Sequence, residues 1–515
     1  MTRPTSPEAI EKRYVGKTLG EVPTPCAVLD RAKVEANCQR MLDAVEKLNI
    51  GWRAHVKSHK TIEITRLQVG DKNDTPVKVI VSTLLEAEKL LPLLKEYQEN
   101  GREVNVLYSF PLFPSCVSRI AALASELGPG AVSVLIDHPD QIPSLAAIRR
   151  SGTAVDAFLK INMGNNRAGV IPRSDACRAL VARLLAAHDE GACRLAGLYA
   201  HAGHSYATRR TWEAMEYLAA ELFALRDVAA DVREQQRRRS QQQPLPLVLS
   251  AGATPTATSL QHPHLREENT TAATTTPGEG DESDLPGSGP AELETLIAEL
   301  RSSPSTAALE VHAGVYPLLD LQQLATHARS EDRGLAASDL ALTVLAEVAS
   351  VYPGRGYDGT AEALINAGSL ALGREPCRDA SVDGEGDYAG WGILMPWRQQ
   401  AKGESSSSTT TSGGGQKKEG EEEEVERHVQ IWPGCEFPHA HGGWEVARIS
   451  QEHGTLAWCG APGDEAPLRV GQRVRVWPNH ACIAGAMFDR YLVVDSRLKG
   501  REDEIVDVWE RWRGW

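Results

Sequence analysis

The sequence has no excess of basic residues, and this absence argues against binding to nucleic acid. The chain of 515 residues has a formal net charge of -14, part of which comes from local acidic runs. A nucleic-acid-binding surface would instead concentrate lysine and arginine. The short basic run at 232–243 has no aromatic residues for base stacking, and we interpret it as the polar end of a helix and the loop behind it. We therefore expect no nucleic-acid partner.

Cysteine pairs, a signal peptide and long apolar runs are also missing. The nine cysteines are scattered and include no CxxC pair, which is typical of reduced thiols rather than of a disulfide framework. The N-terminal segment MTRPTSPEAIEKRYVGK lacks the apolar core of a signal peptide. No window reaches the roughly 18 apolar residues of a membrane-spanning helix. We expect a soluble, cytoplasmic protein with no membrane partner.

Two segments have too few apolar residues to fold. Residues 263–290 are rich in Thr, Gly, Pro and acidic residues, and residues 401–426 are rich in Ser, Thr and Gly before an acidic run. Neither can bury enough apolar surface to offset the entropy of ordering. We interpret both as flexible surface insertions, and a regulatory or docking role is the alternative.

Short apolar segments alternate with helical patterns between residues 50 and 330. The eight expected strands are 52–57, 77–82, 103–109, 131–136, 156–162, 194–200, 245–250 and 308–312. Helical patterns at 84–98, 115–126, 173–188, 208–236 and 290–302 lie between them. This alternation predicts a parallel sheet, and eight repeats fit a closed (β/α)₈ barrel. A doubly wound open sheet is the alternative, but it would carry a glycine-rich turn after its first strand, where this chain has Ser58-His59-Lys60.

The pattern changes after residue 335 to alternating segments separated by turn residues. These segments are 341–350, 444–449, 468–477 and 490–495. They predict a mostly antiparallel β domain, to which residues 24–30 (TPCAVLD) would add a strand. We expect a barrel domain and a β domain, with the bounds 31–335 for the first and 1–30 plus 336–515 for the second.

The run WRAHVKSHK at 52–60 carries an unusual charge pattern. In a strand, Arg53, His55, Lys57 and His59 would share one face. The gathered positive charge disfavours the ammonium form of Lys57, and a neutral lysine amine can form a Schiff base with a carbonyl. An exposed edge strand with a solvated lysine is the alternative.

Small turns follow the last two predicted barrel strands, SAGATPT at 250–256 and HAGVY at 312–316. Barrels often bind phosphate at this position through free backbone N–H groups, and the hydroxyls of Ser250 and Thr254 would add donors. The alternative is that the glycines only permit tight turns. A lysine at the end of the first strand and a phosphate site opposite it together favour pyridoxal 5'-phosphate (PLP) as the cofactor.

The motif PNHAC at 478–482 combines a histidine with a cysteine. If it forms a strand, His480 and Cys482 point to the same side and can reach one metal ion. An imidazole and a thiolate favour Zn²⁺, with water, substrate or a remote side chain completing the shell. A lone His-x-Cys also occurs as ordinary structure.

Seven motifs, in this order, resemble those of the eukaryotic-type D-serine dehydratase family. They are TPCAVLD, RAHVKSHKT, GNNRAGV, YAHAGHSY, SAGATPT, HAGVYPLLD and PNHAC. These dehydratases are fold-type III PLP enzymes related to D-threonine aldolase and alanine racemase. The resemblance covers nearly the whole chain apart from the two insertions.

The resemblance implies a homodimer with its active site between the barrel and the β domain. Lys57 would form the Schiff base with PLP, Arg167 would lie near the phenolic oxygen, and His480 and Cys482 would bind zinc. The residues implied to line the cofactor and its phosphate are Tyr199, Tyr206, Ser250, Gly252, Thr254, Gly314 and Val315. The chain departs from the family at Asn162, where an aspartate is common, and at Val315, where an asparagine is common.

The implied reaction is the conversion of D-serine to pyruvate and ammonia by a PLP- and zinc-dependent lyase, with D-threonine as a second candidate substrate. One alternative is the retro-aldol cleavage of β-hydroxy-D-amino acids, whose enzymes place an acidic residue where this chain has Cys482. Another is a non-catalytic PLP-binding protein, but such relatives lack the β domain. A (β/α)₈ protein without a cofactor is the last alternative.

Overall fold

The chain forms two compact units. The computed structural model describes residues 7–71, 74–239, 243–262, 265, 289–330, 334–377, 388–397 and 443–515. The barrel unit comprises Glu35–Pro317, Thr326–Leu335 and Trp512–Trp515, and the β unit comprises Met1–Val34, Leu318–Ala325 and Ala336–Arg511. The expected insertion at 401–426, and that at 263–290 apart from residues 265, 289 and 290, lie outside the described residues.

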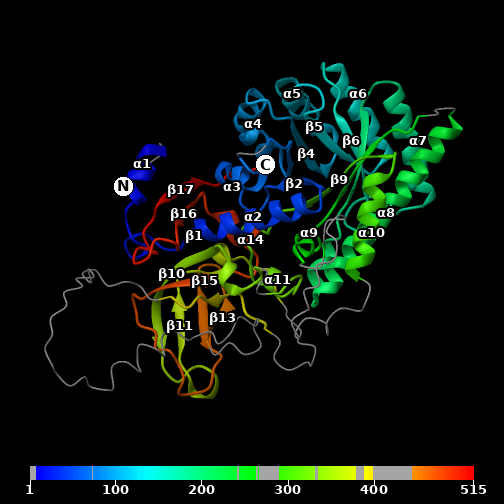
Figure 1. The fold of residues 1–515 in the computed structure, drawn as a ribbon. Coiled ribbons are helices and arrows are strands. Elements are labelled where there is room, and N and C mark those ends of the chain that lie inside the picture. The colour runs from blue at the N-terminus through cyan, green and yellow to red at the C-terminus, as the bar shows by residue number, and fades with distance from the viewer. Residues whose placement is uncertain are drawn as a thin grey trace, which may run out of the picture. The chain divides into compact units, whose positions relative to one another are not determined.

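The barrel unit is built around a closed barrel of eight parallel strands (Figure 1). The strands are β2 (Gly51–His55), β3 (Val77–Val81), β4 (Val104–Pro111), β5 (Val132–Ile136), β6 (Asp156–Ile161), β7 (Arg194–Ala200), β8 (Leu247–Ala251) and β9 (Thr306–Ala313). They pair in chain order, and β9 pairs with β2 to close the ring. The predicted (β/α)₈ barrel and its eight strands are confirmed.

One helix precedes the barrel strands and others connect them. They are α2 (Arg31–Lys47), α3 (Ile62–Val69), α4 (Leu84–Glu99), α5 (Val117–Leu127), α6 (Ile142–Arg150), α7 (Asp175–Asp189), α8 (Thr211–Arg238), α9 (Thr254–Thr258) and α10 (Gly289–Ser302). Three of them begin at a side-chain cap, because the hydroxyls of Thr61, Thr83 and Ser174 accept backbone N–H groups of the first turn. Within the described parts of the chain, no helix is long and apolar enough to cross a membrane.

A buried ion-pair network lies inside the barrel between β2, β3 and β9. Glu310 is fully buried, and its carboxylate pairs with Arg53 Nε at 2.5 Å and with Lys78 Nζ at 3.0 Å. Arg53 also donates to Asn105 Oδ1 at 2.6 Å. Burial alone would raise the pKa of Glu310, but the two cations outweigh it and hold this pKa at about 2. The network therefore neutralises charges that the interior could not hold singly.

We expect Glu310→Ala to lower the free energy of unfolding by about 3–5 kcal/mol, because it leaves the buried guanidinium of Arg53 without its counter-charge. The pKa of Glu310 is depressed in the folded chain, so its stabilisation is present above the ordinary value of 4.5 and is lost as the pH falls toward 2. Urea unfolding between pH 7 and pH 3 measures both effects. Glu88→Ala is the control, since its pair with Arg119 is half-exposed and we expect a change of no more than about 1 kcal/mol. An equal loss in both variants would contradict the expectation.

The β unit contains a nine-stranded sheet in the order β11-β14-β13-β12-β15-β10-β1-β16-β17. Its strands are β1 (Cys26–Asp30), β10 (Leu342–Tyr352), β11 (Glu362–Ile365), β12 (Ile393–Leu394), β13 (Trp444–Ile449), β14 (Gly454–Trp458), β15 (Arg473–Trp477), β16 (Arg490–Val494) and β17 (Asp507–Glu510). Short helices α1 (Pro7–Tyr14), α11 (Leu321–Leu324), α12 (Ser369–Leu372) and α14 (Ala481–Ala484) also belong to this unit. All pairings are antiparallel except that of β1 with β16, which confirms the predicted sheet and the added strand at 24–30. The strand predicted at 468–477 begins only at Arg473.

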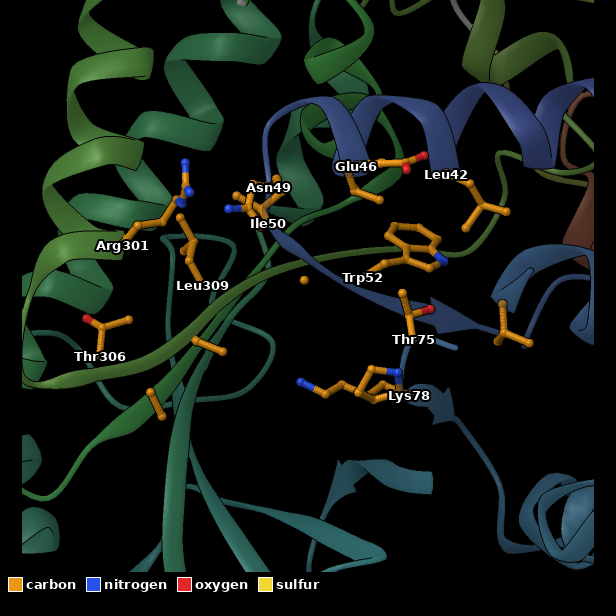
Figure 2. Close-up of a pocket in the computed structure, with 16 residues that line it drawn as sticks. Leu42, Glu46, Asn49, Ile50, Trp52, Thr75, Lys78, Arg301, Thr306 and Leu309 are labelled. Atoms are coloured by element: carbon orange, nitrogen blue, oxygen red, sulfur yellow. The ribbon is translucent and has the colours of Figure 1, made fainter. Parts of the chain in front are cut away.

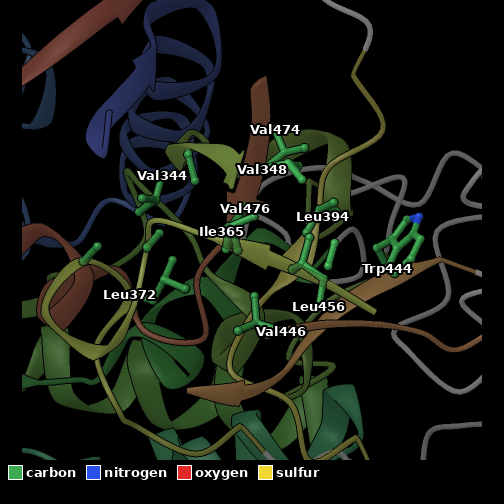
Figure 3. Close-up of a cluster of buried hydrophobic side chains, with 14 of the residues drawn as sticks. Val344, Val348, Ile365, Leu372, Leu394, Trp444, Val446, Leu456, Val474 and Val476 are labelled. Carbon is green, nitrogen blue, oxygen red and sulfur yellow. The ribbon is translucent and has the colours of Figure 1, made fainter. Parts of the chain in front are cut away.

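One face of the sheet in the β unit packs into an apolar core (Figure 3). Alternate residues of β10, β11, β14 and β15 point into it, among them Val344, Ile365, Leu456 and Val476. Trp444 is also buried there, and its indole N–H donates to the carbonyl of Ala466 at 2.8 Å. The β unit therefore has a hydrophobic core of its own.

Candidate active site

Lys57 lies just beyond the carboxyl end of β2, in a turn before α3. The strand ends at His55, so the prediction that Lys57 and His59 continue the strand face of Arg53 is wrong. Arg53 points into the barrel interior instead, where it pairs with Glu310. The positive charge of Arg53 is therefore already neutralised by its partner.

The turn that carries Lys57 is held by buried polar contacts. His59 is fully buried, with its Nδ1 accepting the backbone N–H of Thr61 at 3.2 Å and its Nε2 lying 2.9 Å from Gln68 Oε1. Lys60 adopts a positive φ of 52° and pairs with the buried carboxylate of Glu86 at 2.9 Å. These contacts fix the backbone on which Lys57 stands.

The side chain of Lys57 extends toward the turn that follows β9. Its Cε lies 3.3 Å from the position that a Cβ would occupy at Gly314, and the Cβ of His55 lies at the same distance. A larger residue at position 314 would press against both side chains. Gly314 therefore leaves the space in which the amine of Lys57 can meet a ligand.

Three histidines, of which His55 and His312 are buried and His201 is half-buried, lie near Lys57 at the carboxyl ends of the strands. Burial, followed by nearby positive charges that include Lys57, holds the pKa of His55, His201 and His312 well below the ordinary value of 6.5. The three rings are therefore neutral at pH 7. Nδ1 of His201 donates to the carbonyl of Gly252 at 2.7 Å, which fixes its tautomer.

The turns after β8 and β9 contact each other through one hydroxyl. Oγ1 of Thr254 accepts the backbone N–H of Val315 at 3.0 Å and lies 3.4 Å from that of Gly314. Ser250 Oγ lies 3.1 Å from His312 Nδ1. The contact at position 315 is made by the backbone, so the valine side chain does not disturb it.

Gly252 is required by the close approach of these two turns. Its φ is +142°, and a Cβ there would lie only 2.3 Å from the carbonyl oxygen of His312. Its N–H donates to the carboxylate of Glu221 at 3.2 Å. The structure thus brings Lys57 and the two small turns to the same end of the barrel, as a cofactor with an aldehyde and a phosphate would need.

The GNNRAGV turn after β6 is organised by Asn162. Its Oδ1 accepts the backbone N–H of Gly164 at 2.9 Å and of Asn166 at 3.3 Å. An amide here performs the turn-capping role open to an aspartate. Arg167 is exposed in this turn, and its charge contributes to the pKa of Lys160 and of Tyr199, so its guanidinium lies near both.

Tyr199 is buried at the end of β7 and stacks on the ring of His312, with 4.3 Å between their centroids. Burial raises the pKa of Tyr199, so its hydroxyl stays protonated. Tyr206 is half-buried in the short helical turn Gly203–Ala207 that follows. Tyr199 on β7 and Tyr206 in the loop that follows therefore lie on either side of His201 in the sequence.

Two charged residues of this site were not among the candidates from the sequence. Burial lowers the pKa of Lys160 on β6 to about 7, and its ammonium lies 4.6 Å from the centroid of the Tyr199 ring. Burial raises the pKa of Glu221 on α8 to about 7. The sequence pattern could have indicated both residues. Lys160 interrupts an apolar strand, and Glu221 shares a helix face with the buried Leu218 and Leu225.

The His-x-Cys motif does not form a strand. β15 ends at Trp477, and His480 immediately precedes the helical turn α14, which contains Cys482. The prediction that the two side chains share a strand face is therefore wrong. The helical turn forms because the buried carboxylate of Asp320 accepts the N–H of Ala481 at 2.7 Å.

The chemistry of this motif nevertheless fits zinc. Asn479 fixes the segment by donating to the carbonyls of Glu375 and Gly390 and accepting the hydroxyl of Tyr388 at 2.9 Å. His480 and Cys482 are both half-buried and supply an imidazole and a thiol. Among the described residues, no group of three or more His, Cys, Asp or Glu could hold a metal ion. The part of the chain that the structure describes thus offers two donors of the right type at this motif and no closed structural site.

A cavity of 620 Å³ lies away from this chemistry, at the amino ends of the barrel strands. Figure 2 shows Leu42 and Glu46 of α2, Trp52 of β2 and Arg301 of α10 around it. None of the candidate cofactor-binding residues lines this cavity. This cavity is therefore not the candidate active site, despite its size.

Two protein-family models match the chain. Residues 29–267 match the model described as "Alanine racemase, N-terminal domain", and residues 341–494 match "Putative serine dehydratase domain". A parallel barrel with a lysine after its first strand, together with an antiparallel β unit, defines an alanine-racemase-like enzyme.

Two curated relatives specify the class further, and one solved structure has the same fold. D-serine dehydratase of Schizosaccharomyces pombe is 34% identical over 513 residues, covering 99% of this chain and 96% of that one. D-serine dehydratase of Saccharomyces cerevisiae is 29% identical over 517 residues, covering 98% and 99%. The structure of D-threo-3-hydroxyaspartate dehydratase from Delftia sp. HT23 has a TM-score of 0.63 at 24% identity, covering 97% of this chain and 100% of that one. The chain belongs to the D-serine dehydratase family and is a lyase.

Proposed function

We propose that the chain is a PLP- and zinc-dependent D-serine ammonia-lyase that produces pyruvate and ammonia. The observation that carries this proposal is the position of Lys57. Its side chain extends from the end of β2 toward Gly314. The turns after β8 and β9 lie beside it, and they approach each other so closely that position 252 has room only for glycine. The names of the yeast relatives support the choice of D-serine.

In this proposal, the barrel holds the cofactor. Lys57 Nζ would be its covalent attachment point, and the turns at 250–256 and 312–316 would hold its phosphate. Arg167, which lies near Lys160 and Tyr199, would face its phenolic oxygen. Tyr199 and Tyr206 would line it. Bound PLP supplies an aldehyde that captures the amino group of the substrate and withdraws electrons from its α-carbon.

Lys57 would also move the proton. Once substrate has displaced it, Nζ would take the proton from the α-carbon. The neutral rings of His55, His201 and His312 place no additional positive charge beside this proton. Loss of the α-proton and the β-hydroxyl removes water from D-serine. Hydrolysis of the resulting enamine returns one water and yields pyruvate and ammonia.

His480 and Cys482 would hold the zinc ion. A zinc ion with two protein ligands keeps positions open, and as a Lewis acid it supplies stabilisation for the departing hydroxide. Asp320 would support this site, since it holds the start of α14 and its charge interacts with His480. We further propose that the enzyme is a homodimer, which sedimentation equilibrium would test.

An assay of products separates this proposal from its alternatives. We expect the purified protein to show a visible absorption band that borohydride bleaches, and to release pyruvate and ammonia from D-serine in equal amounts. Pyruvate is measured with lactate dehydrogenase, ammonia with glutamate dehydrogenase, and L-serine is the control substrate. Glycine and an aldehyde from D-threonine, without pyruvate from D-serine, would identify an aldolase. A colourless protein would contradict the cofactor assignment.

A further inference from the structure

Glu221 is a fully buried carboxylate that the proposed reaction does not use. It lies in the middle of α8 and accepts hydrogen bonds from two segments remote in sequence. Its Oε1 accepts the backbone N–H of Ala202, after β7, at 2.6 Å and that of Gly252, after β8, at 3.2 Å. Its Oε2 accepts the hydroxyl of Thr256, at the start of α9, at 3.0 Å.

The partners of Glu221 belong to the turns expected to bind the cofactor. Ala202 follows the strand of Tyr199, and Gly252 precedes Thr254 in the turn after β8. The hydroxyl of Thr256 also accepts the N–H of Ala253 at 2.8 Å, so the carboxylate organises this turn at two successive residues. We propose that Glu221 is a positioning residue that holds the turns after β7 and β8 in the conformation that receives the phosphate of PLP.

The environment of Glu221 supports a role that depends on its hydrogen bonds. A buried carboxylate is costly unless donors surround it, and all three of these partners donate to it. Lys160 contributes a favourable charge from β6. An apolar residue at 221 would leave two backbone N–H groups buried without their acceptor. The turns would then lose the arrangement that Gly252 and Thr254 require.

The role of Gly252 in the cofactor site is changed by this contact. Its N–H donates to Glu221, so this group holds the turn and does not point to a ligand. The small size of Gly252, rather than its N–H, is then what the phosphate site needs. The backbone N–H of Val315 is likewise donated, to Thr254 Oγ1. The hydroxyl hydrogen of Thr254 therefore remains as a donor for a phosphate beside these turns.

The test compares cofactors with and without a phosphate in the full-length enzyme. It rests on the proposed function, because wild-type protein must first bind PLP. We expect Glu221→Ala to weaken PLP binding about tenfold or more, since two buried backbone N–H groups lose their acceptor and the turns lose their anchor. Binding of pyridoxal, which has no phosphate, should change by less than about threefold. Fluorescence titration of the cofactor-free enzyme and the rate of PLP release from the holoenzyme measure these effects.

Matched variants keep the test decisive. Glu221→Gln should restore PLP affinity, because the amide oxygen still accepts both backbone N–H groups and the Thr256 hydroxyl can reverse its role. Thr256→Val removes the contact to Oε2 and the bond from the Ala253 N–H but keeps both backbone contacts of Oε1. It serves if Glu221→Ala does not fold, with a smaller loss expected. Glu234→Ala, at the exposed end of α8, is the control. Equal losses for PLP and pyridoxal, or unchanged PLP affinity, would overturn the inference. A wild-type enzyme that binds no PLP would overturn the proposed function instead.

Discussion

Lys57→Ala is expected to abolish both the visible absorption band and the release of pyruvate from D-serine. The variant removes the amine that would attach the cofactor and the base that would take the α-proton. The loss of the base alone corresponds to about 10²–10⁴-fold in rate, and loss of covalent attachment adds to it. Absorbance spectra of the purified variant and the coupled pyruvate assay measure the two effects separately.

Lys57→Arg separates the charge from the chemistry. A guanidinium keeps the positive charge near His55 and His312, but it does not deprotonate and cannot replace the amine. We expect this variant to be as inactive as Lys57→Ala. Borohydride reduction of the wild-type enzyme, followed by peptide mass spectrometry, should find the cofactor on Lys57. Lys160 has a lowered pKa of about 7 and lies near the same strand ends, so modification of Lys160 instead would contradict the assignment.

The barrel could be predicted from the sequence because its signal is local and repeated. Each strand is a short apolar run, since both faces of a barrel strand are buried. The runs at 131–136 and 194–200, for example, became β5 (Val132–Ile136) and β7 (Arg194–Ala200) almost unchanged. The expectation that candidate functional residues gather at the strand ends followed from the architecture and not from any single motif.

The ends of the elements could not be predicted, because they depend on contacts between distant residues. Alternation in HVKSHK indicated a strand to Lys57, but Thr61 caps α3 and His59 contacts Gln68, so the chain turns earlier. Alternation in PNHAC likewise indicated a strand. The carboxylate of Asp320 is more than a hundred residues away in the sequence and accepts the N–H that starts α14. No local pattern carries that information.

The buried charges show a second limit of the sequence. The helical period places Glu221 on the apolar face of α8, which is enough to predict burial. Its partners at 202, 252 and 256 become neighbours only when the barrel closes. In the same way, Arg53 could be read as an electrostatic neighbour of Lys57 until the structure paired it with Glu310.

Cys482→Ala is expected to remove the zinc and to slow elimination from D-serine while leaving PLP bound. Metal-ion stabilisation of a leaving group contributes several kcal/mol, so the fall in kcat should be at least about 10²-fold. The fold should persist, because Asn479 and Asp320 hold the segment through contacts that do not use the thiol. Metal analysis by mass spectrometry, the absorption spectrum and the pyruvate assay report the three quantities independently.

Removal of the metal from the wild-type enzyme should reproduce the effect of this substitution. A chelator should lower the rate of pyruvate release to that of Cys482→Ala, and added Zn²⁺ should restore the wild-type enzyme but not the variant. Cys459→Ala is the matched control, since Cys459 is an exposed cysteine elsewhere in the β unit and should keep full activity and full zinc content. Full turnover by Cys482→Ala in metal-free buffer would refute the zinc role. Because Cys482→Ala leaves both PLP and Lys57 in place, solvent deuterium exchange at the α-carbon should continue in the variant. This result would place the defect at the departure of hydroxide and not at the step assigned to Lys57.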